Sequence, residues 1–263
     1  MVYRVLLASA LLFSSIPSDH ARSQTVTGGT IAIVHRSNLG VFVGIDSRVT
    51  RTGVLRDSGP VCKIGTKDGV IFFGEGSVSA DPIYDSYEFA NSVISPDLSL
   101  RRIVDLFSDR VFKLAPILNE ARRINPERFD SSFQESKLFD FTFIKYERDS
   151  IYFALCEFRY NLSLVSGLVI SRRISLGANL PKPTMLYGDH EAISQEMRRA
   201  KSNTLGKVKT VSLLRDEIDR LLTLQIKQAP EHIGPPIQII WMRNDGRISW
   251  LKNELPCEPT INR

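Results

Sequence analysis

Short apolar runs separated by polar turns dominate the chain after residue 30. Residues 31–35 and 39–45 are apolar and flank the turn Arg36-Ser37-Asn38, which predicts a β-hairpin. A second strand pair is expected at 61–65 and 70–74. Two further pairs are expected, at 139–146 with 151–157 and at 237–242 with 248–251. The last pair is joined by Arg243-Asn244-Asp245-Gly246, whose Asp-Gly is a strong hairpin signal.

Between these strand pairs, apolar residues recur at three- and four-residue spacing, which predicts helices at 82–93, 100–123, 191–201 and 211–227. Pro116 should kink the second of these helices or end its first part. The predicted strands are apolar on both alternations, as expected when both faces of a sheet are covered. Two packed antiparallel sheets with helices outside would use every element, so the pattern indicates a layered α+β domain.

The first 23 residues have the pattern of a secretory signal peptide. Arg4 precedes a short apolar run at 5–13, too short to span a bilayer, and the small-x-small site Ala21-Arg22-Ser23 follows. The alternative is a frayed N-terminal helix of a cytosolic protein. With the signal at 1–23 removed, we expect an exported protein, secreted or periplasmic, with a short propeptide at 24–29. No later segment is apolar enough for a membrane span.

Composition excludes several function classes. The 263 residues carry a net charge of +5, but the basic residues occur as scattered pairs beside acidic or apolar neighbours, which argues against a nucleic-acid partner. The three cysteines and four histidines lack metal-ligand spacing, so neither a metal nor another cofactor is expected. Two cysteines could form a disulfide in an oxidising compartment. Cys156 lies in an apolar run and is expected to be a buried free thiol.

Gly29-Thr30 followed by an apolar strand, and then Gly40-Val-Phe-Val-Gly-Ile-Asp46-Ser47-Arg48, resembles the start of a proteasome β-subunit. The spacing from Thr30 to Asp46 matches that family, whereas Lys63 falls one residue late against the family's catalytic lysine. The stretch from Gly74 to Asp81 resembles the glycine turn before the family's first helix. The resemblance covers about 30–251 and is specific in its first fifty residues.

The resemblance implies the N-terminal-nucleophile (Ntn) hydrolase fold over 30–255, with residues 256–263 as a C-terminal tail. This fold is a four-layer αββα sandwich of two antiparallel sheets. It also implies self-cleavage at Gly29-Thr30, after which Thr30 is the nucleophile and its free α-amine is the base. Asp46 would pair with Lys63, whose charge would lower the pKa of the amine.

Three further residues receive roles from the same comparison. The backbone N–H of Gly76 would donate to the oxyanion that forms on an acyl substrate. Arg48 would brace the site. Asp189, in the turn Gly188-Asp189-His190 where the family has Ser-Gly, could accept hydrogen bonds from the charged amine.

The chain departs from the family near its last strands. The family has Asp-x-x-Ser-Gly-Gly there, whereas this chain has Pro230-Glu231-His232-Ile233-Gly234, so the Asp and the Ser are both missing. Two main functions therefore stay open: a threonine-type hydrolase acting on a peptide or small amide, and a catalytically inactive proteasome-fold module for binding or assembly. An unrelated α+β periplasmic domain is a third possibility.

The apolar residues of 100–123 cover more than one face of the predicted helix, which leads us to expect a homo-oligomer. Phe112 and Val104 should fall on a second face, available to a partner. The alternative is that a bend at Pro116 brings both faces onto one core.

Overall fold

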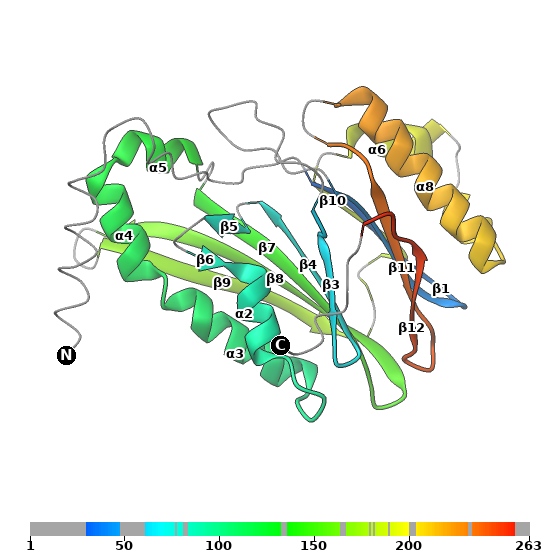
Figure 1. Ribbon diagram of the computed structural model, residues 1–263, viewed down its shortest axis with the longest axis horizontal. Coiled ribbons are helices and arrows are strands. Elements are labelled where there is room, and N and C mark those ends of the chain that lie inside the picture. Colours follow the sequence, from blue (N-terminus) through cyan, green and yellow to red (C-terminus); the bar gives the residue numbers. More distant parts are fainter. Residues whose placement is uncertain are drawn as a thin grey trace.

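The computed structural model describes residues 30–47, 61–76, 78–80, 84–132, 136–163, 167–178, 180, 182–188, 190–199, 204–230 and 233–255. It is an α+β structure with two five-stranded antiparallel sheets and a short two-stranded ribbon (Figure 1). The expected signal peptide, propeptide and C-terminal tail lie outside these residues, as does the Gly29-Thr30 bond.

The first sheet has the strand order β10-β1-β2-β11-β12. Its members are β1 (Ile31–Ser37), β2 (Gly40–Asp46), β10 (Thr184–Gly188), β11 (Ile237–Met242) and β12 (Ile248–Lys252). The second sheet has the order β3-β4-β7-β8-β9. It contains β3 (Ile64–Lys67), β4 (Val70–Gly76), β7 (Lys137–Glu147), β8 (Ser150–Ser163) and β9 (Gly167–Gly177). The ribbon pairs β5 (Ser79–Ala80) with β6 (Tyr84–Asp85).

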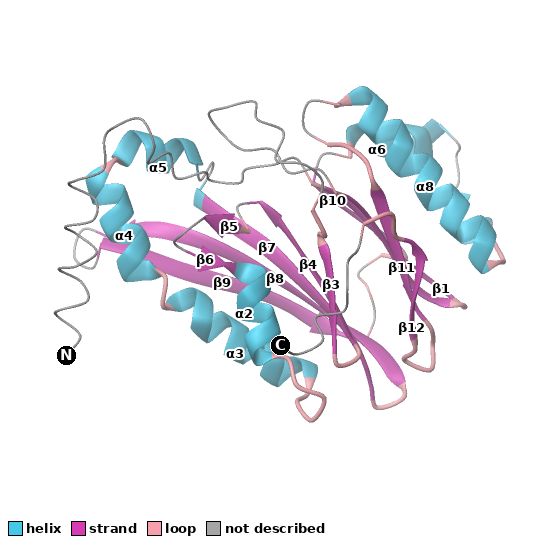
Figure 2. Cartoon of the chain, in the orientation of Figure 1, coloured by secondary structure: helices cyan, strands magenta, loops and turns pink. Residues whose placement is uncertain are grey.

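Helices lie along the outer face of each sheet (Figure 2). The second sheet is accompanied by α2 (Ser86–Val93), α3 (Leu100–Phe112), α4 (Ala115–Ile124) and α5 (Pro126–Ser132). The first sheet is accompanied by α6 (Glu191–Arg199), α7 (Thr204–Lys207) and α8 (Val211–Gln228). None of the helices in the described ranges combines the length and apolar character needed to cross a bilayer.

Three apolar clusters explain this layering. One joins the phenylalanine-rich face of β7 and β8 to α2–α5, and another joins β1, β2 and β11 to α8. The third contains Ala32 and Val43 from the first sheet and Phe73 and Ile144 from the second, so it fills the space between the sheets. Both sheets are thus covered on both faces over their central strands, which explains their lack of a polar alternation. The arrangement is compatible with the expected four-layer sandwich.

Several element boundaries differ from those expected. The expected strand at 61–65 begins only at Ile64, and the helix expected from residue 82 begins at Ser86, after Asp85 caps it by accepting from the N–H groups of Tyr87 and Glu88. The sequence pattern did not predict α5, β9 or β10. β9 lies at a sheet edge and alternates between buried and exposed residues, and β10 has only five residues, so neither gives a continuous apolar run.

The helix expected at 100–123 is two helices. The break falls at Lys113 and Leu114. Pro116 lies in the first turn of α4, where backbone N–H groups have no partner within the helix, so the N–H that proline lacks costs no hydrogen bond. The break also alters the expected second face. Val104 is fully buried against the second sheet, so its assignment to a partner surface was wrong, whereas Phe112 is exposed as expected.

Candidate active site

A buried ion pair joins the two sheets at the Thr30 end of β1. The Lys63 ammonium lies 3.0 Å and 3.1 Å from the two carboxylate oxygens of Asp46. Asp46 ends β2 in the first sheet, while Lys63 immediately precedes β3 in the second. Their side chains are 0% and 8% exposed, so the pair is withdrawn from solvent. The expected buried pairing of these two residues is confirmed.

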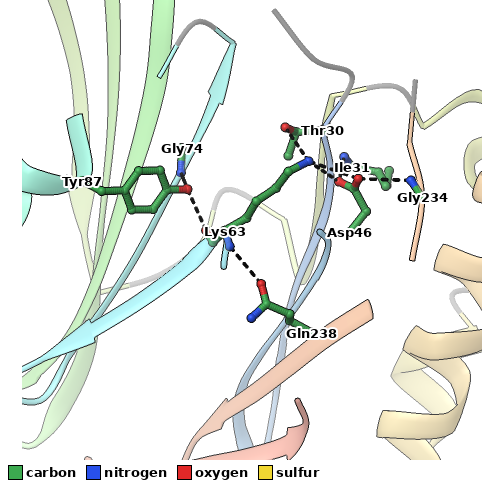
Figure 3. A network of polar contacts seen from close by, with 8 residues as sticks. All are labelled: Thr30, Ile31, Asp46, Lys63, Gly74, Tyr87, Gly234 and Gln238. Carbon is green, nitrogen blue, oxygen red and sulfur yellow. Dashed lines mark hydrogen bonds and ion pairs between the residues drawn. The ribbon is translucent and has the colours of Figure 1, made fainter. Parts of the chain in front are cut away.

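Asp46 also accepts hydrogen bonds from the main chain. Its Oδ1 accepts from the N–H of Ile31 at 3.1 Å, and its Oδ2 accepts from the N–H of Gly234 at 3.3 Å (Figure 3). Both carboxylate oxygens therefore have a backbone donor in addition to the ammonium. A buried carboxylate is costly unless it is paired and hydrogen-bonded, and here both conditions are met.

Thr30 is the third member of this cluster. Its hydroxyl oxygen accepts a hydrogen bond from the Lys63 ammonium at 3.3 Å, and the residue is only 6% exposed. Since Asp46 bonds to the N–H of Ile31, the same carboxylate fixes the chain directly after Thr30. A hydroxyl held against an ammonium is stabilised when it develops negative charge, which is what a nucleophilic oxygen requires.

The main chain of Lys63 is anchored on both sides. Its N–H donates to the side-chain oxygen of Gln238 at 2.9 Å, and its carbonyl accepts from the Tyr87 hydroxyl at 2.7 Å. The Tyr87 oxygen in turn accepts from the N–H of Gly74 at 3.2 Å. In Figure 3 these contacts hold the base of the lysine while its extended side chain reaches Thr30 and Asp46. The backbone of Lys63 is therefore fixed, and this positions its ammonium group between Thr30 and Asp46.

Burial shifts the protonation equilibria of the pair. It lowers the pKa of the Lys63 ammonium, and the neighbouring Asp46 carboxylate opposes that shift. It raises the pKa of Asp46, and Lys63 and the two backbone donors oppose this second shift. Burial also raises the pKa of Tyr87, so its hydroxyl stays protonated and able to donate to the Lys63 carbonyl.

Gly188 packs directly against the main chain of Thr30. It pairs with Ile31 in the β1–β10 ladder and has φ +72°. A Cβ at this position would lie 1.5 Å from the carbonyl oxygen of Thr30, a distance that no side chain can accommodate. β10, which the sequence did not predict, therefore approaches the candidate nucleophile by way of a glycine.

The remaining predicted site residues have different outcomes. Gly76 ends β4 in the left-handed region, with φ +89°, and no hydrogen bond joins it to Thr30 among the described residues. Its role as an oxyanion donor stays a prediction. Arg48 and Asp189 lie outside the described residues, so their roles stay predictions too.

Three residues of the site were missed at the level of sequence. Gln238 lies between Ile237 and Ile239 in an apolar strand. A single amide side chain in a buried strand needs a polar partner, so this residue could have been recognised from the sequence as part of a polar contact. Gly234 acts through its backbone, and it lies in the segment where the family's Asp and Ser are missing. Tyr87 gave no signal, because a tyrosine on an apolar helix face is ordinary core composition.

The cysteines and histidines form no metal site in the described ranges, where no group of three or more potential ligands is arranged around a common point. Cys62, beside the site lysine, is disulfide-bonded, and Cys156 is a buried free thiol, as expected for the latter. His35 lies at the other end of β1 from Thr30.

Comparison with known proteins gives no family assignment: no model of a protein family matches the chain, and no curated protein matches it significantly.

Proposed function

We propose that this protein is an amide hydrolase of the Ntn type, with a proteasome-like fold and Thr30 as its nucleophile. One observation carries the proposal: a buried lysine bridges the Thr30 hydroxyl and the Asp46 carboxylate, at 3.3 Å and 3.0 Å. Burying a charge costs free energy unless an opposite charge and hydrogen bonds compensate for the lost hydration. Here the lysine has its partners, and one of them is the hydroxyl that the sequence resemblance selects.

Maturation comes first in this proposal. The Thr30 hydroxyl attacks the carbonyl carbon of Gly29, the peptide nitrogen leaves as the α-amine of Thr30, and the ester that results is hydrolysed by water. The products are a chain that begins at Thr30 and a released N-terminal segment. The Lys63 ammonium stabilises the charge on the threonine oxygen during attack.

Turnover then uses the new terminus. The α-amine accepts the proton of the Thr30 hydroxyl, the oxygen attacks the substrate amide, and the amine portion of the substrate leaves after taking that proton. Water hydrolyses the acyl-enzyme. A free α-amine has a pKa near 8, and the nearby Lys63 charge lowers it, so more of it is neutral at pH 7.

Other residues have supporting roles in the proposal. The N–H of Gly76 donates to the oxyanion on the acyl carbon, Arg48 braces the strand end, and Asp189 accepts a hydrogen bond from the amine. Asp189 would raise the pKa of that amine, opposing Lys63. The pKa of the α-amine is therefore set by the balance between the effects of Asp189 and Lys63.

Export is part of the same proposal. The N-terminal pattern of a signal peptide is one support, and the disulfide at Cys62 is a second, because disulfides persist mainly in oxidising compartments. Export followed by self-cleavage yields a mature chain that starts at Thr30.

The test compares three proteins expressed with the signal in place: the wild type, Thr30→Ala and Thr30→Ser. N-terminal sequencing and intact mass should find Thr30 as the first residue in the wild type and an uncut Gly29-Thr30 bond in Thr30→Ala. Serine retains a hydroxyl, so Thr30→Ser should still be cut and should still hydrolyse amides, more slowly. A stable wild-type chain beginning at Gln24, or unchanged amide hydrolysis by Thr30→Ala, contradicts the proposal.

The second candidate is a non-catalytic binding or assembly module of the same fold. It is favoured by the missing Asp and Ser near Pro230–Gly234, and by the use of the Gly234 N–H to hold Asp46 in place. In this case the Lys63–Asp46 pair is a structural clamp between the sheets. The two candidates differ in the first residue of the mature chain.

A homo-oligomer remains part of the proposal, and Phe112 and Ile117 support it. They are 37% and 49% exposed on α3 and α4, respectively, and mark apolar surface that a second copy could cover. Light scattering of the purified protein at micromolar concentration distinguishes an assembly from a monomer.

A further inference from the structure

A cavity of about 430 Å³ lies between the two sheets, next to the edge strands β9 and β10. Its apolar wall includes Phe153 and Leu155 from β8, Met185 from β10, and Leu180 from the connection between β9 and β10. Thr142 and Tyr187 contribute hydroxyl groups. This volume is within the range of small-molecule sites, roughly 300–1,000 Å³.

The residues that line the cavity include no charged side chain. Tyr187 keeps its proton, because burial raises its pKa to about 12, and it lies close enough to Asp140 and Glu75 to feel their charges. The lining therefore favours an uncharged apolar group over a carboxylate or a phosphate.

The β1–β10 ladder relates this cavity to Thr30. Tyr187 pairs with Ala32 and Met185 pairs with Val34, so these two lining residues lie opposite positions two and four residues beyond Thr30. At a rise of about 3.3 Å per residue, they are about 7 Å and 13 Å along the strand from the candidate nucleophile. Ala32 and Val34 belong to the cluster between the sheets, where the cavity also lies.

We infer that this cavity binds the apolar acyl group of an uncharged N-acyl amide whose carbonyl is at Thr30. The inference rests on the proposed function and names the substrate class for that site. To reach Leu155, Leu180 and Met185, an aliphatic chain bonded to the carbonyl carbon at Thr30 runs along β10 and displaces the ring of Tyr187, which packs edge-on against Phe73. Selection by the length of the acyl chain follows from this geometry.

The first experiment measures kcat/KM of the mature protein for acyl p-nitroanilides from acetyl to decanoyl. Each added methylene that enters the cavity should raise kcat/KM about twofold to fourfold, until the cavity is full. A flat dependence on chain length, or a preference for acetyl, overturns the inference.

Variants then locate the acyl site. Leu155→Trp fills the cavity and should lower the octanoyl-to-acetyl ratio of kcat/KM by at least about tenfold, which corresponds to the loss of roughly two buried methylenes. Leu155→Ala enlarges the cavity and should move the optimum to longer chains. The matched control is Leu162→Trp, on the same strand but 52% exposed and outside the cavity lining. An equal fall in the ratio for Leu162→Trp contradicts the assignment.

Binding without turnover separates this inference from the proposed function. Calorimetry uses Thr30→Ala produced without residues 1–29, so that no N-terminal segment is attached at the site. Hexanamide, octanamide and decanamide should bind with affinities that rise with chain length and fall in the added presence of Leu155→Trp. Such binding supports the cavity even if the wild type cleaves no amide, and the lack of cleavage then counts against the proposed function alone. Amide cleavage with no dependence on chain length or on Leu155 rejects the cavity alone.

Discussion

Two lysine–carboxylate clusters in this protein differ in how completely they are satisfied. In the candidate site, Lys63 serves one carboxylate, Asp46, which also has a backbone donor for each oxygen. In the second cluster, Lys137 is shared between Glu75 at 3.4 Å and Asp140 at 2.8 Å. There the side chains are 28%, 21% and 15% exposed, and one oxygen of Asp140 is buried without a hydrogen-bond partner.

The two clusters also differ in how many parts of the chain they connect. The first cluster joins β2 to the start of β3 and takes donors from β1 and from the segment before β11, so four parts of the chain converge on it. The second joins β4 and β7 within one sheet, and it contacts the other sheet through the hydrogen bond that Glu75 accepts from the N–H of Gly188 on β10. Because the second cluster is more exposed, we expect changes at Asp46 and Lys63 to affect folding and activity together, and changes at Lys137, Glu75 or Asp140 to be milder.

The largest expected effect is that of Asp46→Ala. It leaves the Lys63 ammonium buried without its counter-charge, and breaking a buried pair in this way typically costs about 3–5 kcal/mol. Urea unfolding should show a loss of this size. The double variant Asp46→Asn/Lys63→Met removes both charges and should regain a large part of it. A loss of less than about 1 kcal/mol would mean that the pair contributes little to the stability of the packed sheets.

A buried histidine without a charged partner sharpens the comparison. His35 is 1% exposed, its Nδ1 lies 2.9 Å from the Thr184 hydroxyl, and its Nε2 has no hydrogen-bond partner. Burial lowers its pKa from 6.5 to about 4. Because the folded pKa is below the unfolded one, the stability that neutral His35 provides is complete above pH 6.5 and is lost as the pH falls towards 4.

The loss from this one residue should reach about 3 kcal/mol at pH 4. Denaturant midpoints of the wild type and His35→Gln, measured from pH 7 to pH 4, test it. The carboxylates titrate in both proteins, so the difference between the two curves isolates His35. Parallel curves would mean that His35 titrates normally in the folded state.

A smaller effect, of about 1 kcal/mol or less, is expected for Glu75→Gln in the second cluster. Burial raises the pKa of Glu75, with Lys137 opposing the shift. The stability that its protonated form provides is present below the unfolded pKa and is lost as the pH rises through the folded pKa. Glu75→Gln should remove that loss, so its stability relative to the wild type should improve between pH 4 and pH 8. A relative decline over this range would show that Lys137 dominates.

The smallest effect on stability is expected for Thr30→Val. Valine has nearly the shape of threonine, and the bond from Lys63 is the one described hydrogen bond of the hydroxyl. Unfolding free energy should change by less than about 1 kcal/mol, because Lys63 keeps its pairing with Asp46. Processing at Gly29-Thr30 should nevertheless stop. A large loss of stability would assign the hydroxyl a structural role instead.

The sequence by itself determined the four hairpin strand pairs and the segments that form α2, α3, α4, α6 and α8. Their apolar runs and periodic faces are strong enough that tertiary contacts did not override them. It did not by itself select Thr30, Asp46 and Lys63, because each of these residue types is ordinary at its position. The resemblance to a proteasome β-subunit supplied the reason to consider these three together, and their catalytic roles stay predictions.

Only the tertiary structure decided the rest of the site. Gln238, Gly234 and Tyr87 reach Asp46 and Lys63 from positions 24 to 188 residues away in the chain, through one amide, one backbone N–H and one phenol. No local pattern encodes such contacts, since each depends on which strands become neighbours. The same holds for β10, whose five residues are ordinary in sequence and gain their position beside Thr30 only by pairing with β1. Burial, and with it the lowered pKa of Lys63, exists only once the two sheets have closed over the ion pair.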